Sequence, residues 1–121
     1  MHELAIAESL VDVVTRHARG RKVAKVEVKV GHLRQVVPTA LEFAFELTAQ
    51  GTVADGAELE LEEVAAAGAC RSCGAESELP GFPLQCAECK GFDVKVIRGE
   101  ELLVDSLELE EELVTSRGSG A

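Results

Sequence analysis

Two pairs of closely spaced cysteines constrain this chain more than any other feature. The four cysteines fall as Cys70-Arg-Ser-Cys73 and Cys86-Ala-Glu-Cys89, with twelve residues between the pairs. A gap of two residues lets one turn present two sulfurs to a single ion, and four thiolates at about 2.3 Å suit tetrahedral Zn²⁺. The pattern predicts a zinc site at Cys70, Cys73, Cys86 and Cys89. Because four cysteines close the coordination sphere, this zinc would be structural rather than catalytic.

Two disulfides are the alternative arrangement of four cysteines. They are typical of small secreted domains, whereas cysteine is a small share of these 121 residues and the start of the chain does not resemble a signal peptide. Glu3, Glu8 and Asp12 interrupt its apolar residues, and no run of about 18 apolar residues predicts a membrane helix. We therefore expect a soluble cytoplasmic protein with reduced thiols and no membrane insertion.

The hydrophobic period changes along the chain and predicts the secondary structure. A spacing of three and four residues indicates an amphipathic helix, and a spacing of two indicates a strand with one buried face. We expect helices over residues 4–18 and 38–50 and strands over residues 23–30, 58–62, 94–96 and 102–109. The last strand should contain a bulge near Asp105-Ser106, because its apolar residues change parity there.

The order of these elements predicts an α+β fold with an insertion. A last strand that returns to the first sheet makes a small mixed three-stranded sheet with two helices, interrupted by a zinc-ribbon-like domain. We expect residues 1–67 and 98–114 to form one discontinuous α/β domain and residues 68–97 the zinc-binding domain. Residues 115–121 have the composition of a flexible tail. The small residues 65–68 should act as a hinge.

The charge distribution argues against nucleic acid as a partner. The formal net charge is -10, with +3 over residues 1–34 (seven Lys/Arg, four Asp/Glu) and -13 over the rest (five against eighteen). The cysteines lie in the acidic part, whereas phosphate binding needs a basic surface. Trp and Tyr are absent, so bases would have few aromatic platforms. The four phenylalanines, Phe43, Phe45, Phe82 and Phe92, are expected in the core.

Sequence motifs of catalysis are missing. The chain contains no Gly-rich phosphate loop followed by Lys-Ser/Thr and no nucleophile elbow, and all four thiols are assigned to zinc. We therefore expect a protein that is not an enzyme and that depends on a partner for any nucleotide hydrolysis.

The first three residues, Met1-His2-Glu3, form a possible second metal site. A histidine at position two can join its imidazole, the α-amine and the intervening amide in fused chelate rings, and the amide of Glu3 can supply a fourth nitrogen. Four nitrogens in a plane suit Ni²⁺ or Cu²⁺, and binding requires loss of protons. Spacing alone leaves a simpler interpretation open, in which His2 binds no metal, because a histidine near a terminus is more often just solvent-exposed.

The whole chain resembles the HypA/HybF family of nickel metallochaperones. The resemblance rests on Met-His-Glu-Leu-Ala-Ile-Ala-Glu-Ser-Leu at the start, then Val-Lys-Val-Gly, Leu-Glu-Phe-Ala-Phe-Glu, the two cysteine pairs and Gly-Glu-Glu-Leu, and it runs from Met1 to about Glu110. It implies Ni(II) as cargo at Met1, His2 and Glu3, with Glu3 acting through its amide or carboxylate. It also implies a structural Zn(II) at the four cysteines.

The resemblance further implies partners and a role. It predicts delivery of nickel to the large subunit of [NiFe]-hydrogenase during maturation, with urease as a second client in some members, and a HypB-type GTPase as partner. The chain would act as a monomer or homodimer. Two alternatives follow from the residues themselves: a zinc-ribbon protein-interaction module without nickel transfer and, less favoured, a zinc-ribbon nucleic-acid binder.

Two further histidines are assigned structural or solvent-exposed positions. His17 falls near the end of the first predicted helix, where an imidazolium complements the helix dipole. His32 follows Gly31 after the first strand, at a position where the family often has an acidic residue. We expect His32 to be a solvated loop residue rather than a metal ligand.

Overall fold

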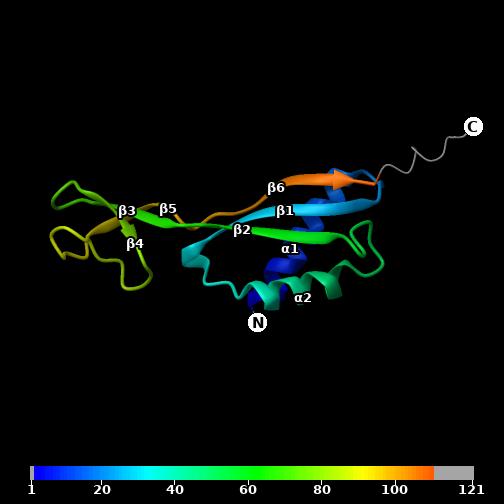
Figure 1. Ribbon diagram of the computed structural model, residues 1–121, viewed down its shortest axis with the longest axis horizontal. Helices are drawn as coiled ribbons and strands as arrows, with labels where there is room; N and C mark the ends of the chain where they lie inside the picture. The colour runs from blue at the N-terminus through cyan, green and yellow to red at the C-terminus, as the bar shows by residue number, and fades with distance from the viewer. Residues whose placement is uncertain (1, 111–121) are drawn as a thin grey trace, which may run out of the picture. The chain divides into compact units, whose positions relative to one another are not determined.

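The computed structural model describes residues 2–110 and contains two α-helices, one 3-10 helix and six strands over that range. The elements follow one another as α1 (His2–Ala18), β1 (Val23–Gly31), η1 (His32–Arg34), α2 (Pro38–Ala49), β2 (Glu58–Val64), β3 (Ala66–Cys70), β4 (Glu76–Leu79), β5 (Val94–Arg98) and β6 (Leu102–Leu109) (Figure 1). The predicted tail at 115–121 lies outside the described residues. Neither α1 nor α2, as described, has the length and apolar run needed to cross a bilayer.

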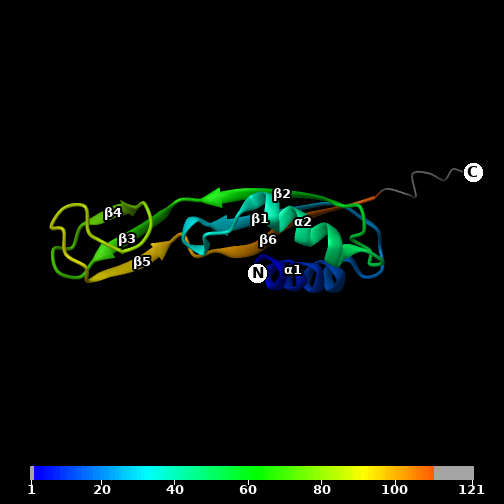
Figure 2. The ribbon, with the colours of Figure 1, turned by 90° about the horizontal axis from the view of Figure 1, so that it is seen from below.

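The first sheet has three strands in the order β2-β1-β6. In Figure 1 the arrows of β1 and β2 point the same way and that of β6 the opposite way, so the sheet is mixed, as predicted. Both helices run alongside it (Figure 2). Each contributes an apolar stripe to the core, because residues spaced by three and four share one face of a helix. The buried residues of the helices are Ala7, Leu10, Val11, Val14 and Ala18 in α1 and Leu41, Ala44, Phe45 and Ala49 in α2.

The phenylalanines do not all belong to the core, contrary to the prediction. Phe45 is 2% exposed, whereas Phe43, Phe82 and Phe92 are 62%, 59% and 65% exposed. Phe43 is two positions from Phe45 on α2, which turns the two side chains about 200° apart around the helix axis. Only one of them can therefore face the sheet.

The second sheet, in the order β4-β3-β5, carries the cysteines. β3 pairs antiparallel with both neighbours, Ala66 with Leu79 on one side and Cys70 with Val94 on the other. A Cβ at Gly68 would lie 2.4 Å from the Val94 side chain. Three of the four small residues predicted to act as a hinge, residues 66–68, are instead part of the central strand β3. They are small because its neighbours pack closely against it.

The chain folds into two compact units, and it passes from one to the other within β1, at the start of α2, within β2 and within β6. One unit holds α1 and α2; the other holds η1 and the second sheet. The second unit has a small core of its own, formed by Leu33, Ala66 and Leu79, with Leu84, Val94 and Val96 packed against it. The domain boundaries predicted at 67/68 and 97/98 stay predictions.

Backbone segments approach each other closely at the start of η1. The N–H of Gly31 donates to the carbonyl of Glu101 at 2.7 Å, and that of Leu33 donates to the carbonyl of Gly99 at 2.8 Å. A Cβ at Gly31 would stand 2.0 Å from the Gly99 oxygen, which is well inside van der Waals contact. Glycine is therefore required at position 31.

Candidate metal sites

The two cysteine pairs adopt the same local backbone. In each pair the N–H of the first cysteine donates to the carbonyl five residues on, and its carbonyl accepts from the N–H four residues on. These two distances are 2.9 and 2.9 Å at Cys70 and 2.8 and 3.0 Å at Cys86. Each turn therefore holds its two sulfurs by an identical pattern, and the two turns face one ion position from separate loops.

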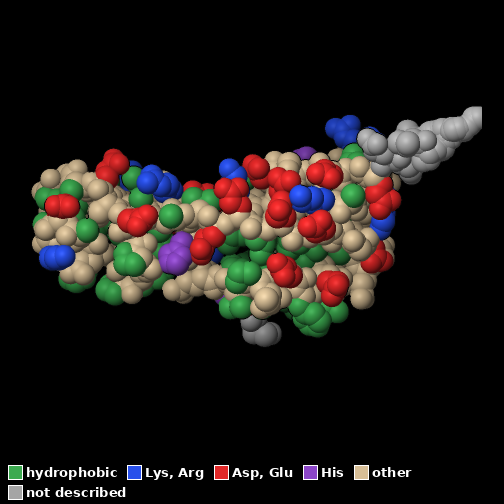
Figure 3. Space-filling view, viewed as in Figure 1, with side chains coloured by type: hydrophobic (Ala, Val, Ile, Leu, Met, Phe, Trp, Pro, Cys, Tyr) green, Lys and Arg blue, Asp and Glu red, His purple; other side chains and the backbone are tan. Residues whose placement is uncertain are grey.

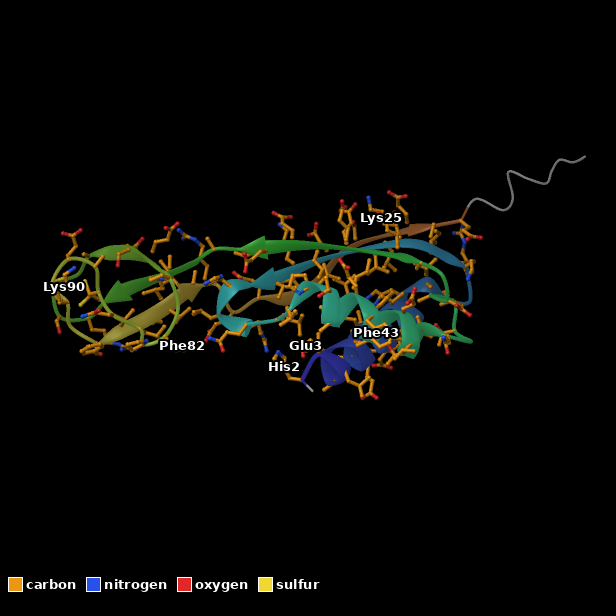
Figure 4. All side chains as sticks on the ribbon, turned by 60° about the horizontal axis from the view of Figure 1, so that its bottom comes forward. His2, Glu3, Lys25, Phe43, Phe82 and Lys90 are labelled. Carbon is orange, nitrogen blue, oxygen red and sulfur yellow. The ribbon has the colours of Figure 1, made fainter. Side chains whose placement is uncertain are left out.

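One position in each turn requires a left-handed backbone. It is the fourth residue after the first cysteine, Gly74 with φ +80° in one turn and Lys90 with φ +64° in the other. Glycine adopts this conformation without a steric penalty, whereas lysine has a Cβ that makes it unfavourable. Figure 4 shows Lys90 at its turn.

The sulfurs are spaced as a tetrahedral metal site requires. Cys70 Sγ is 3.7 Å from Cys89 Sγ, Cys73 Sγ is 3.6 Å from Cys86 Sγ, and all four sulfurs lie within 4.8 Å of one another. A tetrahedron with bonds of about 2.3 Å has edges of about 3.8 Å. A disulfide would bring two sulfurs to about 2.05 Å, and all four cysteines are free. The four cysteines therefore fit a closed zinc site.

Backbone N–H groups favour the thiolate at the first cysteine of each pair. The N–H of Cys73 lowers the pKa of the Cys70 thiol to about 7, and the N–H of Cys89 lowers the pKa of Cys86. At Cys73 the N–H of Ala75 also lowers the pKa, but the neighbouring Cys86 thiol and burial outweigh it and raise the pKa to about 11. The thiolate is the form that binds metal. The turns therefore favour the metal-binding form at Cys70 and Cys86, whereas a metal ion must displace a proton from Cys73.

The predicted nickel residues lie at the start of α1. His2 is the first residue of the helix, with its side chain 54% exposed, and its Nε2 is 3.4 Å from Oε2 of Glu3, whose side chain is 12% exposed. Figure 4 shows the two side chains beside each other. Met1 lies outside the described residues, so the structure brings together two of the three predicted nickel residues.

The other two histidines differ in what they contact. His17 is in the last turn of α1, as predicted, with Nδ1 2.9 Å from the carbonyl oxygen of Val13. His32 is in η1, and both of its ring nitrogens have protein partners, Glu63 and the carbonyl of Pro80. His32 was expected in a loop and lies instead in a 3-10 helix, but its side chain is 41% exposed and is therefore solvated, as expected. Its partners are far along the chain, so no local sequence signal marks them.

Residues 1–109 match the family described as hydrogenase/urease nickel incorporation, metallochaperone, hypA. The chain belongs to the HypA family. Relatives named hydrogenase maturation factor HypA are 46% identical in Geotalea uraniireducens (strain Rf4) and 43% identical in Geobacter sp. (strain M21). Each match runs over 110 residues, which is 91% of this chain and 100% of the relative.

The fold is also that of a HypA protein. It is similar to the solution structure of the Ni metallochaperone HypA from Helicobacter pylori, with a TM-score of 0.67 and 22% sequence identity over 88% of this chain and 96% of that one. The family resemblance and the α+β class predicted from the sequence are confirmed. As a HypA member, the chain belongs to a group of nickel-incorporation metallochaperones in hydrogenase maturation, which is not a class of catalysts.

Proposed function

We propose that this HypA member binds one Ni(II) at Met1, His2 and Glu3 and delivers it to the large subunit of [NiFe]-hydrogenase. Urease is a second candidate client. A HypB-type GTPase would supply the nucleotide hydrolysis, because the chain has no phosphate-binding loop of its own. The cytoplasm is the proposed location, since zinc-binding thiols stay reduced there. The observation that carries the proposal is the start of α1 at His2, beside the Glu3 carboxylate.

The beginning of a helix favours metal binding through amide nitrogens. The N–H groups of the first turn take no part in the i to i−4 hydrogen-bond ladder, so replacing their protons by a metal breaks no helical bond. The positive end of the helix dipole also stabilises the anionic amides that such binding creates. At His2 and Glu3 the helix therefore opposes metal binding far less than it would further along α1.

The orientation of the His2 ring supports a division of roles between its nitrogens. A six-membered chelate ring from the His2 amide closes on Nδ1, whereas Nε2 is the nitrogen that lies near the Glu3 carboxylate. A carboxylate on the second nitrogen of a metal-bound imidazole fixes the ring and strengthens it as a ligand. We therefore assign the Glu3 amide as the fourth nitrogen ligand and the Glu3 carboxylate as the group that orients His2.

Zinc is assigned a separate, resident role. Cys70, Cys73, Cys86 and Cys89 would hold one structural Zn(II), and the spacing of their sulfurs supports this. Thiolates bound to zinc are not available to nickel, and a planar set of nitrogens is a poor match for tetrahedral zinc. The two metals are thereby separated by ligand type and geometry.

The test is nickel titration of untagged, zinc-loaded protein whose Met1 is verified by mass. We expect one equivalent of bound nickel, and we expect both His2→Ala and a two-residue N-terminal extension to abolish it with zinc content unchanged. His17→Ala is the matched control, because His17 is on the same helix and should leave nickel binding intact. Unaltered nickel affinity in both N-terminal variants would refute the assignment and favour the zinc-ribbon interaction module.

Two substitutions at position 3 distinguish the role of the Glu3 amide in nickel binding from that of the Glu3 carboxylate. Proline is tolerated in the first turn of a helix and has no amide proton to lose, so Glu3→Pro should abolish planar nickel binding. Glu3→Gln keeps the amide and removes the charge, so it should weaken binding by about 10-fold to 100-fold. If Glu3→Gln abolishes binding as fully as Glu3→Pro, the carboxylate is itself the ligand.

A further inference from the structure

His32 has two hydrogen-bond partners in the zinc-bearing unit, one on each ring nitrogen. Its Nδ1 is 3.0 Å from Oε2 of Glu63 in β2, and its Nε2 is 2.8 Å from the carbonyl oxygen of Pro80, which follows β4. The three residues come from three segments of the same compact unit. The imidazole ring therefore joins the end of β2 to the loop that begins at Pro80.

Both partners of His32 are acceptors, and this fixes the protonation state that the geometry needs. A backbone carbonyl and an ionised carboxylate accept hydrogen bonds and donate none, while a neutral imidazole has a single N–H. Only the imidazolium can donate to both partners at once. His17 provides the contrast, because its Nδ1 contacts a single carbonyl oxygen, that of Val13, and a neutral tautomer satisfies this bond.

We propose that His32 is a pH-sensitive latch: as an imidazolium it ties β2 to the Pro80 loop, and loss of its proton releases one of the two bonds. None of these three residues is a proposed zinc or nickel ligand, so the inference goes beyond the proposed function and does not depend on it.

The direction of the pH dependence follows from the charges around the ring. Glu63 is the charged group that faces it; Arg34, on the same 3-10 helix, donates instead to the carbonyl of Glu100 at 2.9 Å. The hydrogen bond to Glu63, followed by that to the Pro80 carbonyl, raises the pKa of His32 above 6.5. While Glu63 is ionised, the latch is therefore mostly closed at pH 6.5 and opens as the pH rises through the raised pKa of His32.

The latch acts on a loop with an exposed aromatic residue. Phe82 is 59% exposed, two residues after Pro80, and Figure 4 shows it on this loop. When His32 loses its proton, the ring keeps one donor for two acceptors, and the Pro80 carbonyl and the Glu63 carboxylate compete for it. The proton on His32 thus controls how firmly the loop holds Phe82 in place.

The test is an NMR titration of the full-length, zinc-loaded protein between about pH 5 and pH 8. Ring ¹⁵N shifts report which nitrogens of His32 are protonated, and the amide of Gly81 reports on the loop. We expect both ring nitrogens to be protonated at pH 6.5 and the Gly81 amide to shift with the same midpoint as the ring. A neutral His32 ring at pH 6.5, or a Gly81 amide that does not follow the ring, would overturn the proposal.

Three variants complete the experiment. His32→Gln keeps one donor and cannot titrate, so the pH transition of Gly81 should be lost; a transition that persists overturns the latch. Glu63→Gln keeps an acceptor but removes the charge, and it should move the His32 midpoint to lower pH, while an unmoved midpoint contradicts the pairing. His17→Gln should leave the Gly81 transition unchanged. Zinc is measured at each pH, and only points with one zinc per chain are compared.

Discussion

At the scale of single residues, Gly74 and Lys90 provide a matched pair in the two cysteine turns. They occupy equivalent positions with φ of +80° and +64°, but only one of them is glycine. Lys90→Gly should raise the free energy of unfolding of the zinc-loaded protein by about 0.5 to 1 kcal/mol, because the left-handed backbone costs about 1 to 2 kcal/mol for a residue with a Cβ and the added freedom of the unfolded chain offsets part of that gain. Urea unfolding at saturating zinc measures the change.

The matched controls for this substitution are Lys90→Ala and Gly74→Ala. Lys90→Ala removes the charge but keeps the Cβ, so it should give no comparable gain. Gly74→Ala should cost about 1 kcal/mol through φ alone, because no atom stands within 4 Å of a Cβ there. A gain from Lys90→Ala equal to that from Lys90→Gly would show that charge, not backbone conformation, sets the effect.

The residues that could be predicted from the sequence are those whose chemistry depends on short spacing. The cysteine pairs and the Met1-His2-Glu3 start are local patterns, and the sequence predicts a metal site at each, the second with the help of the family resemblance. His32 depends on Glu63 and Pro80, which are 31 and 48 residues away along the chain, so nothing near His32 distinguishes it from a solvated histidine. The nickel and zinc ligand sets themselves stay proposals.

At the scale of secondary-structure elements, we expect the fold of the second sheet to depend on the proposed zinc at its cysteines. Its core cluster consists of Leu33, Ala66 and Leu79, of which only the two leucines are large, and this is little apolar area for an independent fold. Cys73→Ser should therefore remove hydrogen-exchange protection from β3, β4 and β5 while sparing the helical circular dichroism of α1 and α2. Structural zinc in small domains binds with about 10 to 16 kcal/mol, so loss of one ligand is a large perturbation.

The Cys73→Ser experiment needs a control and has a result that would contradict the expectation. Arg71→Ala is the control, because it breaks the exposed ion pair with Asp93 at 2.8 Å without touching a sulfur, and exposed pairs contribute little. It should leave both protection and zinc content unchanged. If Cys73→Ser also removes the helical signal, the two units are not separable in folding.

The elements with a clear hydrophobic period were predicted well, and the short ones were not. α1, α2 and β1 have long runs of period 3.6 or 2, and the observed bounds of α2, Pro38–Ala49, agree closely with the prediction. β4 has only four residues, Glu76–Leu79, which is too few for alternation to be distinguished from a loop. The stretch around β3 looked flexible because small residues also mark tight packing, and sequence alone does not separate the two.

At the scale of the whole molecule, the acidic charge should exclude nucleic acid as a ligand. Figure 3 shows Asp and Glu side chains gathered over the strands of the first sheet, with fewer Lys and Arg among them. With a net charge of -10, phosphates would be repelled rather than neutralised. Fluorescence anisotropy with single-stranded and duplex oligonucleotides at about 50 mM salt should show no binding. Binding that weakens steeply with salt would contradict this and revive the nucleic-acid alternative.

The sequence does not show where the chain passes between the two compact units, and the predicted domain boundaries stay predictions. The small residues before the first cysteine predict a boundary there, and the chain passes between the compact units inside β1, at the start of α2, inside β2 and inside β6. The strands themselves connect the two units, so no linker composition marks the passage. A pattern of alternating residues shows that one face of a strand is buried. It does not show which part of the protein packs against the first or the second half of that strand.

The spacing of the four sulfurs also determines how the unit that contains the cysteines would unfold if it holds the proposed zinc. A metal ion that joins Cys70 to Cys89, nineteen residues on, closes a loop in the way that a disulfide would, and such closure lowers the entropy of the unfolded chain by an amount equivalent to about 3 kcal/mol. Unlike a disulfide, this cross-link is indifferent to reductants. Chelators and acid would undo it, so for reduced thiols the free zinc concentration and the proton concentration would decide whether the loop is closed.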